Sequence, residues 1–477
     1  MGLANVVDEA RNALLNAADR AAGMVTPTVK LGVTGLSRAG KTVFITALVH
    51  NLLNGGRLPL FRAWASGRVT SAVLNPQPDD AVPRFDYETH VGHMVAHRQW
   101  PQSTKRIAEL RVTISFESAS PLARALRRNR LHLDIVDYPG EWLLDLPLLG
   151  KDFATWSCEA LARARRSTTP DAAAWLSQLA ALPEPAPADE ALARELATGF
   201  TAYLRASRSG LTPALLAPGR FLAPGDLDGS PALTFSPLIS PVGALANMMA
   251  HRYEAYKTHV VRPFFRDHFA RLDRQIVLVD ALPALNAGSG ALDDLRTAVS
   301  EVLAVFRTGR SNWWPAFFGR RISRILIAAN KADHIHHSDH DRLERTLAHI
   351  LREPIEAARQ LGAAVEILAL ASVRSTREAS VVKGGERLPA IVGTPLVGTE
   401  LGGRTFAGDA EVALFPGDLP EDPRALFAAP ASGTDPTHGF LAFRPPPLER
   451  SVDGLARSLP HIRMDRAMEF LIGDYLQ

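Results

Sequence analysis

The chain has 477 residues, of which 46% are hydrophobic and 22% are charged, the profile of a globular protein. Lys and Arg total 53 against 50 Asp and Glu, and this formal net charge of +3 does not by itself indicate a nucleic-acid-binding protein. The single cysteine, Cys158, excludes an internal disulfide and a thiolate zinc site and fits a reducing cytoplasm, and the lack of a run of about 18 apolar residues predicts no transmembrane segment.

Hydrophobic periodicity predicts the first helices and strands. Residues 4–22 carry an apolar stripe, which predicts an amphipathic helix docked on the body of the protein. A short apolar strand over 28–35 and a helix over 41–53 follow, and Asn-Gly-Gly ends that helix. Residues 57–107 are interrupted by Pro and Gly and show little period, so we expect a long ordered loop there.

The rest of the chain alternates between apolar strands and helical patterns. Strands over 109–117 and 131–137 are joined by a short link, so we expect them to be antiparallel neighbours. Residues 143–268 are mostly helical in pattern and predict an α-helical insertion. Parallel βα units are predicted after it. Their strands are expected at 275–281, 324–329 and 365–371, and their helices at 291–306 and 341–360.

A phosphate-binding loop is predicted where the first strand meets its helix. The segment GLSRAGKT matches G-x-x-x-x-G-K-[ST] without a gap, so its backbone N–H groups and the helix start can surround a triphosphate. Lys41 would bridge the β- and γ-phosphates, and Thr42 would offer its hydroxyl to Mg²⁺. A chance Gly-rich turn is a remote alternative. The nucleotide-binding residues predicted here are Gly35, Ser37, Arg38, Ala39, Gly40, Lys41, Thr42 and Val43.

A second motif, Asp137-Tyr138-Pro139-Gly140, closes the strand over 131–137 as D-x-x-G. Asp137 can hold Mg²⁺, and the Gly140 amide can reach the γ-phosphate and sense its presence. Glu141 follows, at the place where Ras-like enzymes keep a glutamine that orients water. We include Glu141 among the candidate catalytic residues, although the γ-phosphate repels a carboxylate.

A third motif, Asn330-Lys331-Ala332-Asp333, follows an apolar strand as N-K-x-D and suits guanine. The Asp333 carboxylate can accept from guanine N1–H and the 2-amino group, whereas adenine would leave it unpaired, a mismatch that discriminates strongly. Lys331 would lie along the ring face. His334, and Ser372 and Val373 after the strand over 365–371, are further candidates for contact with the base.

A second hydroxyl ligand for Mg²⁺ is expected in the loop before the strand over 109–117. Ser103 and Thr104 lie there, and we prefer Thr104 to the more distant Thr70 and Thr89. Trp100 in the same loop could pack over the nucleotide.

Arg38 lies inside the phosphate loop, in a G-L-x-R-x-G-K pattern that resembles the loop of guanylate-binding large GTPases. In those enzymes this arginine serves as an internal finger, which contributes on the order of 10³–10⁵ in rate. A solvated arginine or a salt bridge is an equally weighted alternative. Together with Lys41 and Glu141, Arg38 completes the candidate catalytic set.

The order of the three motifs resembles the translation-factor and Ras-like class of GTPases. The segments GLSRAGKT, RFDYETH, WPQST, DIVDYPGEW and NKADH together resemble the YcjX family of bacterial stress-associated P-loop NTPases, described variously as ATPases or GTPases. The resemblance covers nearly the whole chain. It implies a cytoplasmic protein and leaves open a peripheral place at the inner membrane, with a membrane-bound protein partner in the envelope stress response.

Four histidines in the segment HIHHSDH invite a metal-binding interpretation: His334, His336, His337 and His340. They have no thiolate companions and lead into a helix, so a solvated helix start is the favoured interpretation.

We therefore expect an α/β fold, a three-layer P-loop NTPase G domain with an α-helical insertion. The expected function is Mg²⁺-dependent binding of GTP and GDP with hydrolysis of GTP, in a nucleotide-controlled switch that takes a protein partner and no specific nucleic acid. The alternatives are an ATPase with a relaxed base pocket and a non-catalytic nucleotide-gated scaffold. The expected segments are an N-terminal helix at 1–27, the G domain at 28–142 and 269–377, a helical insertion at 143–268, an irregular or β-rich insertion at 378–450 and a C-terminal helix at 451–477.

Overall fold

The computed structural model covers most of the chain. It describes residues 26–35, 38–77, 79–102, 106–119, 129–209, 218–222, 224, 227, 229–240, 242–305, 322–383, 385–401, 403–427, 439–448 and 458–477. The helix predicted at 4–22 lies outside these residues. Among the described residues, no helix is both long enough and apolar enough to cross a membrane.

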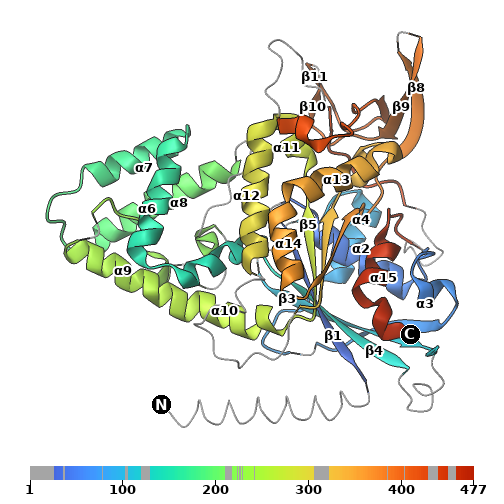
Figure 1. Cartoon of the computed structure of the whole chain (residues 1–477), viewed down its shortest axis with the longest axis horizontal. Coiled ribbons are helices and arrows are strands. Elements are labelled where there is room, and N and C mark those ends of the chain that lie inside the picture. Colours follow the sequence, from blue (N-terminus) through green and yellow to red (C-terminus); the bar gives the residue numbers. More distant parts are fainter. Residues whose placement is uncertain are drawn as a thin grey trace.

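A seven-stranded sheet forms the centre of the protein, in the order β2-β3-β4-β1-β5-β6-β7 (Figure 1). Only β3 runs against the other strands: it pairs antiparallel with β2 and β4, as the sequence predicts for β4, while the remaining pairs are parallel. The strands are β1 (Thr28–Gly35), β2 (Val69–Asn75), β3 (Ala108–Phe116), β4 (Arg130–Asp137), β5 (Arg274–Val279), β6 (Arg324–Ala329) and β7 (Ala364–Ala369).

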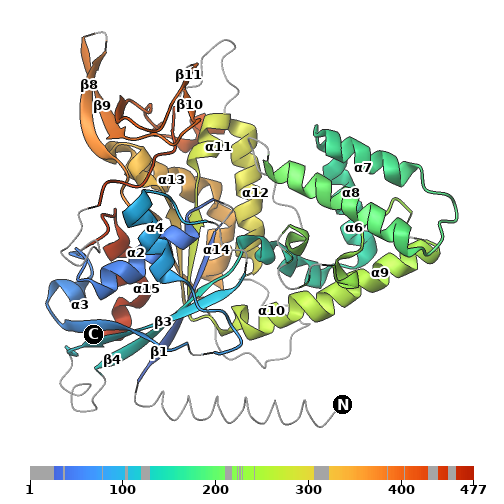
Figure 2. The same cartoon turned by 180° about the vertical axis from the view of Figure 1, so that it is seen from behind.

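Helices cover both faces of this sheet (Figure 2). Along β5, Ile276 and Leu278 face one hydrophobic core, while Val277 and Val279 face the other, as the alternation of a strand requires. The first core includes residues of α2 (Lys41–Leu53), α4 (Tyr87–His97) and α15 (Met464–Ile472). The second includes residues of α11 (Leu282–Ala287), α12 (Ser289–Val305), α13 (His340–Ile350) and α14 (Arg352–Gln360). The predicted three-layer α/β fold is therefore confirmed.

Two local predictions are wrong. Residues 57–107 are not a long loop, because they contain α3 (Arg62–Ala65), β2 and α4. The expected helix over 341–360 is divided into α13, which ends at Ile350, and α14, which begins at Arg352. The division is explained by Pro354, because proline has no N–H to donate to the Ile350 carbonyl.

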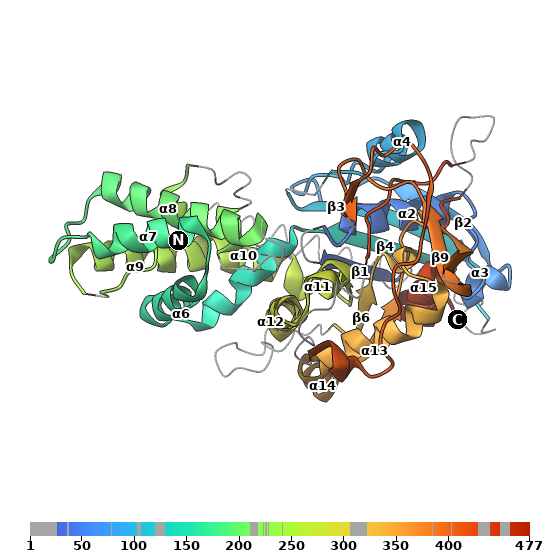
Figure 3. The ribbon, with the colours of Figure 1, turned by 90° about the horizontal axis from the view of Figure 1, so that it is seen from above.

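The helices within the predicted insertion lie together to one side of the sheet (Figure 3). They are α6 (Phe153–Arg166), α7 (Pro170–Ala180), α8 (Glu190–Ser209), α9 (Ala244–Tyr256) and α10 (Arg262–Asp267), with a π-helical turn at Lys257–Val261. Aromatic side chains hold them together: Trp156 stacks on Tyr253, and Trp175 stacks on Tyr203. The division of the chain at residues 142 and 269 stays a prediction.

Short β-structure follows the main sheet. The hairpin of β8 (Arg377–Lys383) and β9 (Glu386–Gly393) extends with β12 (Val412–Leu414), and β10 (Glu400–Leu401) pairs with β11 (Arg404–Thr405). The hairpin projects beyond the carboxyl edge of the sheet (Figure 1). The 3-10 helices are η1 (Gly140–Gly150), η2 (Gly219–Phe221), η4 (Pro231–Leu233), η6 (Phe269–Arg271), η8 (Ala332–His334), η9 (His337–Asp339), η10 (Pro423–Phe427) and η11 (Gly473–Leu476).

Candidate nucleotide site

The three motifs meet at the carboxyl edge of the parallel strands. In the sheet register Val33 of β1 lies beside Asp137 of β4, and Gly35 lies beside Leu278 of β5. Asn330 follows β6 directly, and β6 is in register with β7. Loops at this edge of an open α/β sheet are the usual place for a ligand.

The phosphate loop is built for an anion. Arg38 and Gly40 adopt left-handed backbone conformations, with φ of 64° and 87°, and Ala39 between them does not. Alternation of left-handed and right-handed residues turns successive N–H groups toward one point. Gly40 is the N-cap of α2, and no side chain caps the helix there. By contrast Asp86 caps α4 with its carboxylate. The N-cap residue of α2 therefore supplies no side-chain oxygen to the helix start, which is a typical position for a phosphate. Ser37 lies outside the described residues.

Lys41 connects the phosphate loop to the D-x-x-G motif. Its ammonium donates to the Gly35 carbonyl oxygen at 3.1 Å. Gly140 lies against the same carbonyl group: a Cβ on residue 140 would come within 2.0 Å of the Gly35 oxygen and 3.6 Å of Lys41 Nζ. The D-x-x-G turn and the phosphate loop are thus in direct contact.

Hard oxygen donors lie on both sides of this contact. Thr42 is in the first turn of α2 and 6% exposed, and Asp137 ends β4 and is 1% exposed. The Thr42 hydroxyl lies 3.5 Å from the Gln102 carbonyl oxygen, so the loop before β3 runs beside α2. Ser103 and Thr104 come next in that loop, outside the described residues. Hydroxyl and carboxylate oxygens are the donors that Mg²⁺ accepts.

Asn330 joins the phosphate loop to the segment after β7. Its side-chain N–H donates to the Ala39 carbonyl at 2.7 Å, and its oxygen accepts from the Ser372 amide at 3.3 Å and hydroxyl at 3.1 Å. Asn330 and Ser372 are both buried, at 3% exposure each. Asn330 therefore links the phosphate loop to the segment after β7, and the Val373 side chain lies in the same hydrophobic core as residues of α2.

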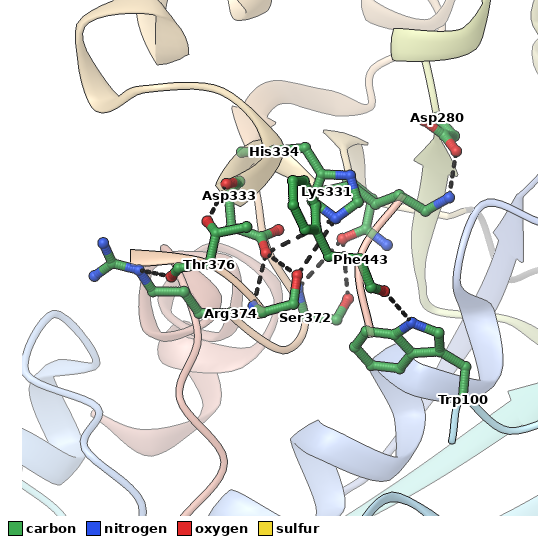
Figure 4. A network of polar contacts seen from close by, with 12 residues as sticks. Trp100, Asp280, Lys331, Asp333, His334, Ser372, Arg374, Thr376 and Phe443 are labelled. Atoms are coloured by element: carbon green, nitrogen blue, oxygen red, sulfur yellow. Dashed lines mark hydrogen bonds and ion pairs between the residues drawn. The ribbon is translucent and has the colours of Figure 1, made fainter. Parts of the chain in front are cut away.

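Asp333 is held by residues that the sequence analysis missed (Figure 4). The Ser375 amide and hydroxyl both donate to its Oδ2, at 2.7 Å and 2.6 Å. The Thr376 hydroxyl donates to the Asp333 carbonyl. Asp333 is only 3% exposed, and these bonds fix the direction of its carboxylate. The sequence offers only a weak signal for them, a Ser-Thr pair shortly after a strand.

Lys331 has a partner that the sequence analysis also missed. Its ammonium forms an ion pair with Asp280, the residue after β5 (Figure 4). The backbone of Lys331 is left-handed, with φ of 64°. The ion pair and this conformation together set the direction of the side chain that is predicted to lie along the base.

His334 and Trp100 both contact Phe443, the first through its ring and the second through a hydrogen bond. The His334 ring stands edge-on to the Phe443 ring at 5.1 Å between centroids, and the Trp100 indole N–H donates to the Phe443 carbonyl at 2.7 Å (Figure 4). Burial lowers the pKa of His334 below its usual value. This histidine is therefore neutral at pH 7. Its contact with a base, like that of Trp100, stays a prediction.

Glu141 follows Gly140 in η1. Its predicted role concerns a side chain outside the described part of the structure, so that role stays a prediction.

The phosphate loop between β1 and α2, the D-x-x-G turn packed against it and the N-K-x-D loop at the same edge define an α/β protein with a P-loop GTPase-like fold. Within that class, the chain belongs to the YcjX-like family, DUF463, whose family model matches residues 29–476. It is 36% identical over 467 residues to the "Ras-like GTPase YcjX" of Escherichia coli K12, covering 94% of this chain and 96% of the relative. It is 34% identical over 478 residues to the protein of the same name from Shewanella oneidensis MR-1, covering 94% and 95%.

Proposed function

We propose that this chain binds GTP and GDP and hydrolyses GTP to GDP and phosphate, as a nucleotide-controlled switch. One observation carries the proposal: Asn330 of the N-K-x-D motif is hydrogen-bonded to Ala39 of the phosphate loop, which joins the two halves of a nucleotide site. The relatives in E. coli and S. oneidensis, which are named Ras-like GTPases, support it.

Guanine specificity follows from the environment of Asp333. Both hydrogen bonds from Ser375 are accepted by Oδ2 of Asp333. The other carboxylate oxygen, Oδ1, can therefore accept from guanine N1–H and the 2-amino group. Adenine presents a lone pair at N1 and no amine at C2. A buried carboxylate would then face an acceptor, a mismatch that costs orders of magnitude in affinity.

The residues present fit Mg²⁺. Thr42 and Asp137 supply a hydroxyl and a carboxylate at one edge of the sheet, and Thr104 is the predicted third ligand. Bound there, Mg²⁺ would supply positive charge that offsets the negative charge of the phosphates.

The chain's own groups would do the remaining work of hydrolysis. The α2 amides and Lys41 bind the phosphates, and Arg38 adds positive charge where the transition state becomes more negative. The contact of Gly140 with Gly35 and Lys41 supports the proposal that the Gly140 amide responds to a γ-phosphate. Glu141 is the candidate for positioning the attacking water.

A competition titration tests the proposal. Fluorescent GDP is bound to the full chain in Mg²⁺ and displaced by GTP or by ATP, for wild type, Asp333→Ala and the control Asp341→Ala. Asp341 is also an aspartate, but its side chain is 79% exposed and lies on α13. We expect displacement by GTP and not ATP, lost in Asp333→Ala and retained in the control.

The other outcomes favour the alternative functions. Equal displacement by ATP that is insensitive to Asp333→Ala would indicate an ATPase with a relaxed base pocket. Guanine-specific binding without phosphate release, unchanged by Glu141→Gln, would indicate a nucleotide-gated scaffold for a protein partner. The stress-response role and a membrane-bound partner rest on the family resemblance alone.

A further inference from the structure

The four histidines of the segment HIHHSDH separate into two pairs. His334 and His340 point inward: His334 is 6% exposed, and His340 bonds through Nε2 to the Ala332 carbonyl oxygen at 2.9 Å. His336 and His337 lie at the surface around the start of η9, with ring centroids 4.2 Å apart. His337 is exposed, and His336 is half-buried.

A carboxylate from a distant part of the chain joins this surface pair. Glu378 of β8 places Oε2 2.9 Å from His337 Nδ1, although the two residues are 41 positions apart. His336, His337 and Glu378 each offer one ligand atom, and these three atoms lie within 4.8 Å of one another. The His337 side chain is 63% exposed and that of Glu378 is 34% exposed, so an ion can reach the cluster from solvent.

We propose that His336, His337 and Glu378 bind one divalent transition metal ion of the Zn²⁺ type. Two imidazoles and one carboxylate are a donor set for zinc, with a water as fourth ligand, whereas Mg²⁺ and Ca²⁺ prefer all-oxygen sites. Zinc–ligand bonds of about 2.0–2.1 Å bring ligand atoms to roughly 3.3 Å apart in a tetrahedron. Because the side chains are at the surface, they can close to that spacing by rotation.

The neighbours of the cluster fit this role. Nδ1 of His336 lies 2.9 Å from Ser338 Oγ and accepts from the Ser338 amide at 3.4 Å. When Nδ1 carries the proton and donates it to Oγ, Ser338 is an outer-shell partner that orients the ring while Nε2 takes the metal. Arg374 lies 3.9 Å from Glu378, but on Oε1 rather than on the Oε2 that faces His337. The arginine therefore competes for the carboxylate without covering the oxygen that the ion needs.

The position of the metal site suggests what it does, a step that rests on the proposed function. His336 and His337 follow the loop that carries Asp333, and Glu378 follows Ser375 and Thr376, which hold Asp333. A bound ion would connect these two segments directly. Metal binding should then tighten guanine-nucleotide binding, and nucleotide should tighten metal binding by the same factor.

Zinc titration of the full chain tests the site. The protein is treated with chelator and carries Cys158→Ser throughout, because the Cys158 thiol is exposed and could bind zinc. The site variants are His336→Ala with His337→Ala, and Glu378→Gln. The control is His93→Ala with His97→Ala, which removes two other histidines, one turn apart on α4. Circular dichroism verifies the fold of each variant.

We expect one zinc ion per chain and a loss of affinity of at least about tenfold in both site variants, since even outer-shell changes cost 10–100-fold. The control should bind zinc like the parent, and Co²⁺ should give an intense visible band in the parent and the control but not in the site variants. Equal zinc binding by the parent and the site variants would overturn the proposal. Failure of guanine nucleotides to bind would refute the proposed function, whereas the zinc titration decides the metal site independently.

Discussion

Gly140 lies against the carbonyl oxygen of Gly35 so closely that a Cβ on residue 140 would come within 2.0 Å of that oxygen. Neither glycine has a left-handed φ, so the requirement at this position is for space. The Lys41 ammonium donates to the same carbonyl group. A movement of the D-x-x-G turn would therefore change the contacts of both the Gly35 carbonyl group and the Lys41 ammonium.

Gly140→Ala should weaken nucleotide binding, because a methyl group there forces the two loops apart. Overpacking of this kind costs roughly 1–3 kcal/mol, which would correspond to about 5- to 160-fold in affinity if the whole cost falls on the nucleotide-bound state. Titration with GDP and GTP measures the loss. The control is Gly150→Ala, at the other end of η1, where a Cβ would meet no described atom within 4 Å. Unchanged affinity in Gly140→Ala would mean that this contact opens when nucleotide binds.

Arg38 combines an exposed side chain with a left-handed backbone of φ 64°. Among the described residues, no ion pair involves Arg38, so the salt bridge is disfavoured, and the internal finger and a solvated arginine are the two interpretations to test. A non-glycine residue in this conformation is under strain of the order of 1 kcal/mol. Such strain is common where a side chain must point at a ligand.

Two substitutions separate the backbone from the side chain. If Arg38 is a finger, both Arg38→Ala and Arg38→Gly should lower the rate of GTP hydrolysis, by on the order of 10³, and leave GDP affinity nearly unchanged. Arg38→Gly should also stabilise the loop, since glycine accepts the left-handed conformation without strain. Single-turnover phosphate release measures the rate of hydrolysis, and titration with GDP measures the affinity. Wild-type turnover in either variant would rule out the finger.

The fold and the motifs were predictable where the signal is local. The strand over 28–35, the helix over 41–53 and the strand over 324–329 were predicted with the bounds that the structure gives them. The β2 strand was missed because it lies at the edge of the sheet and is half-exposed, so its apolar alternation is weak. A signal for α4 was present: Asp86 precedes it and accepts from the Thr89 amide.

The supporting residues of the site could not be predicted because their partners are far away in the chain. Ser375 is 42 positions from Asp333, and Asp280 is 51 positions from Lys331. No periodicity or short motif encodes such a pair: the pairs arise because parallel strands bring their following loops to one edge. Glu378 beside His337 is likewise a pair of residues far apart in the chain, and so the sequence alone favoured a solvated helix start.

Asp145 connects the segment after the D-x-x-G motif to the helices within the predicted insertion. It lies in η1 at 2% exposure and accepts from the Tyr256 hydroxyl at 2.7 Å and the Gly219 amide at 2.6 Å. A further bond comes from the Arg220 amide at 3.3 Å, and the Arg220 guanidinium lies over the Trp142 ring. Burial raises the pKa of Asp145 to about 6. The protein therefore holds a buried carboxylate that is ionised at neutral pH at a cost in stability.

The raised pKa predicts how stability depends on pH. The folded state binds the Asp145 proton more tightly than the unfolded chain, so this contribution is fully present below the unfolded pKa of about 3.9 and is lost as pH rises through about 6. Asp145→Asn cannot titrate. The free energy of unfolding of wild type minus that of Asp145→Asn should therefore rise by about 2 kcal/mol as pH falls from 7.5 to 4.5.

Urea unfolding at a series of pH values measures this difference, because groups common to both proteins cancel. Asp152→Asn is the matched control: Asp152 caps α6, and the Thr155 side chain holds the pKa of its carboxyl below the usual value. Its titration falls below the range studied, so its difference from wild type should be flat between pH 7.5 and 5. A flat difference for Asp145→Asn as well would mean that Asp145 is solvated and that the segment after Gly140 is not fixed to Tyr256.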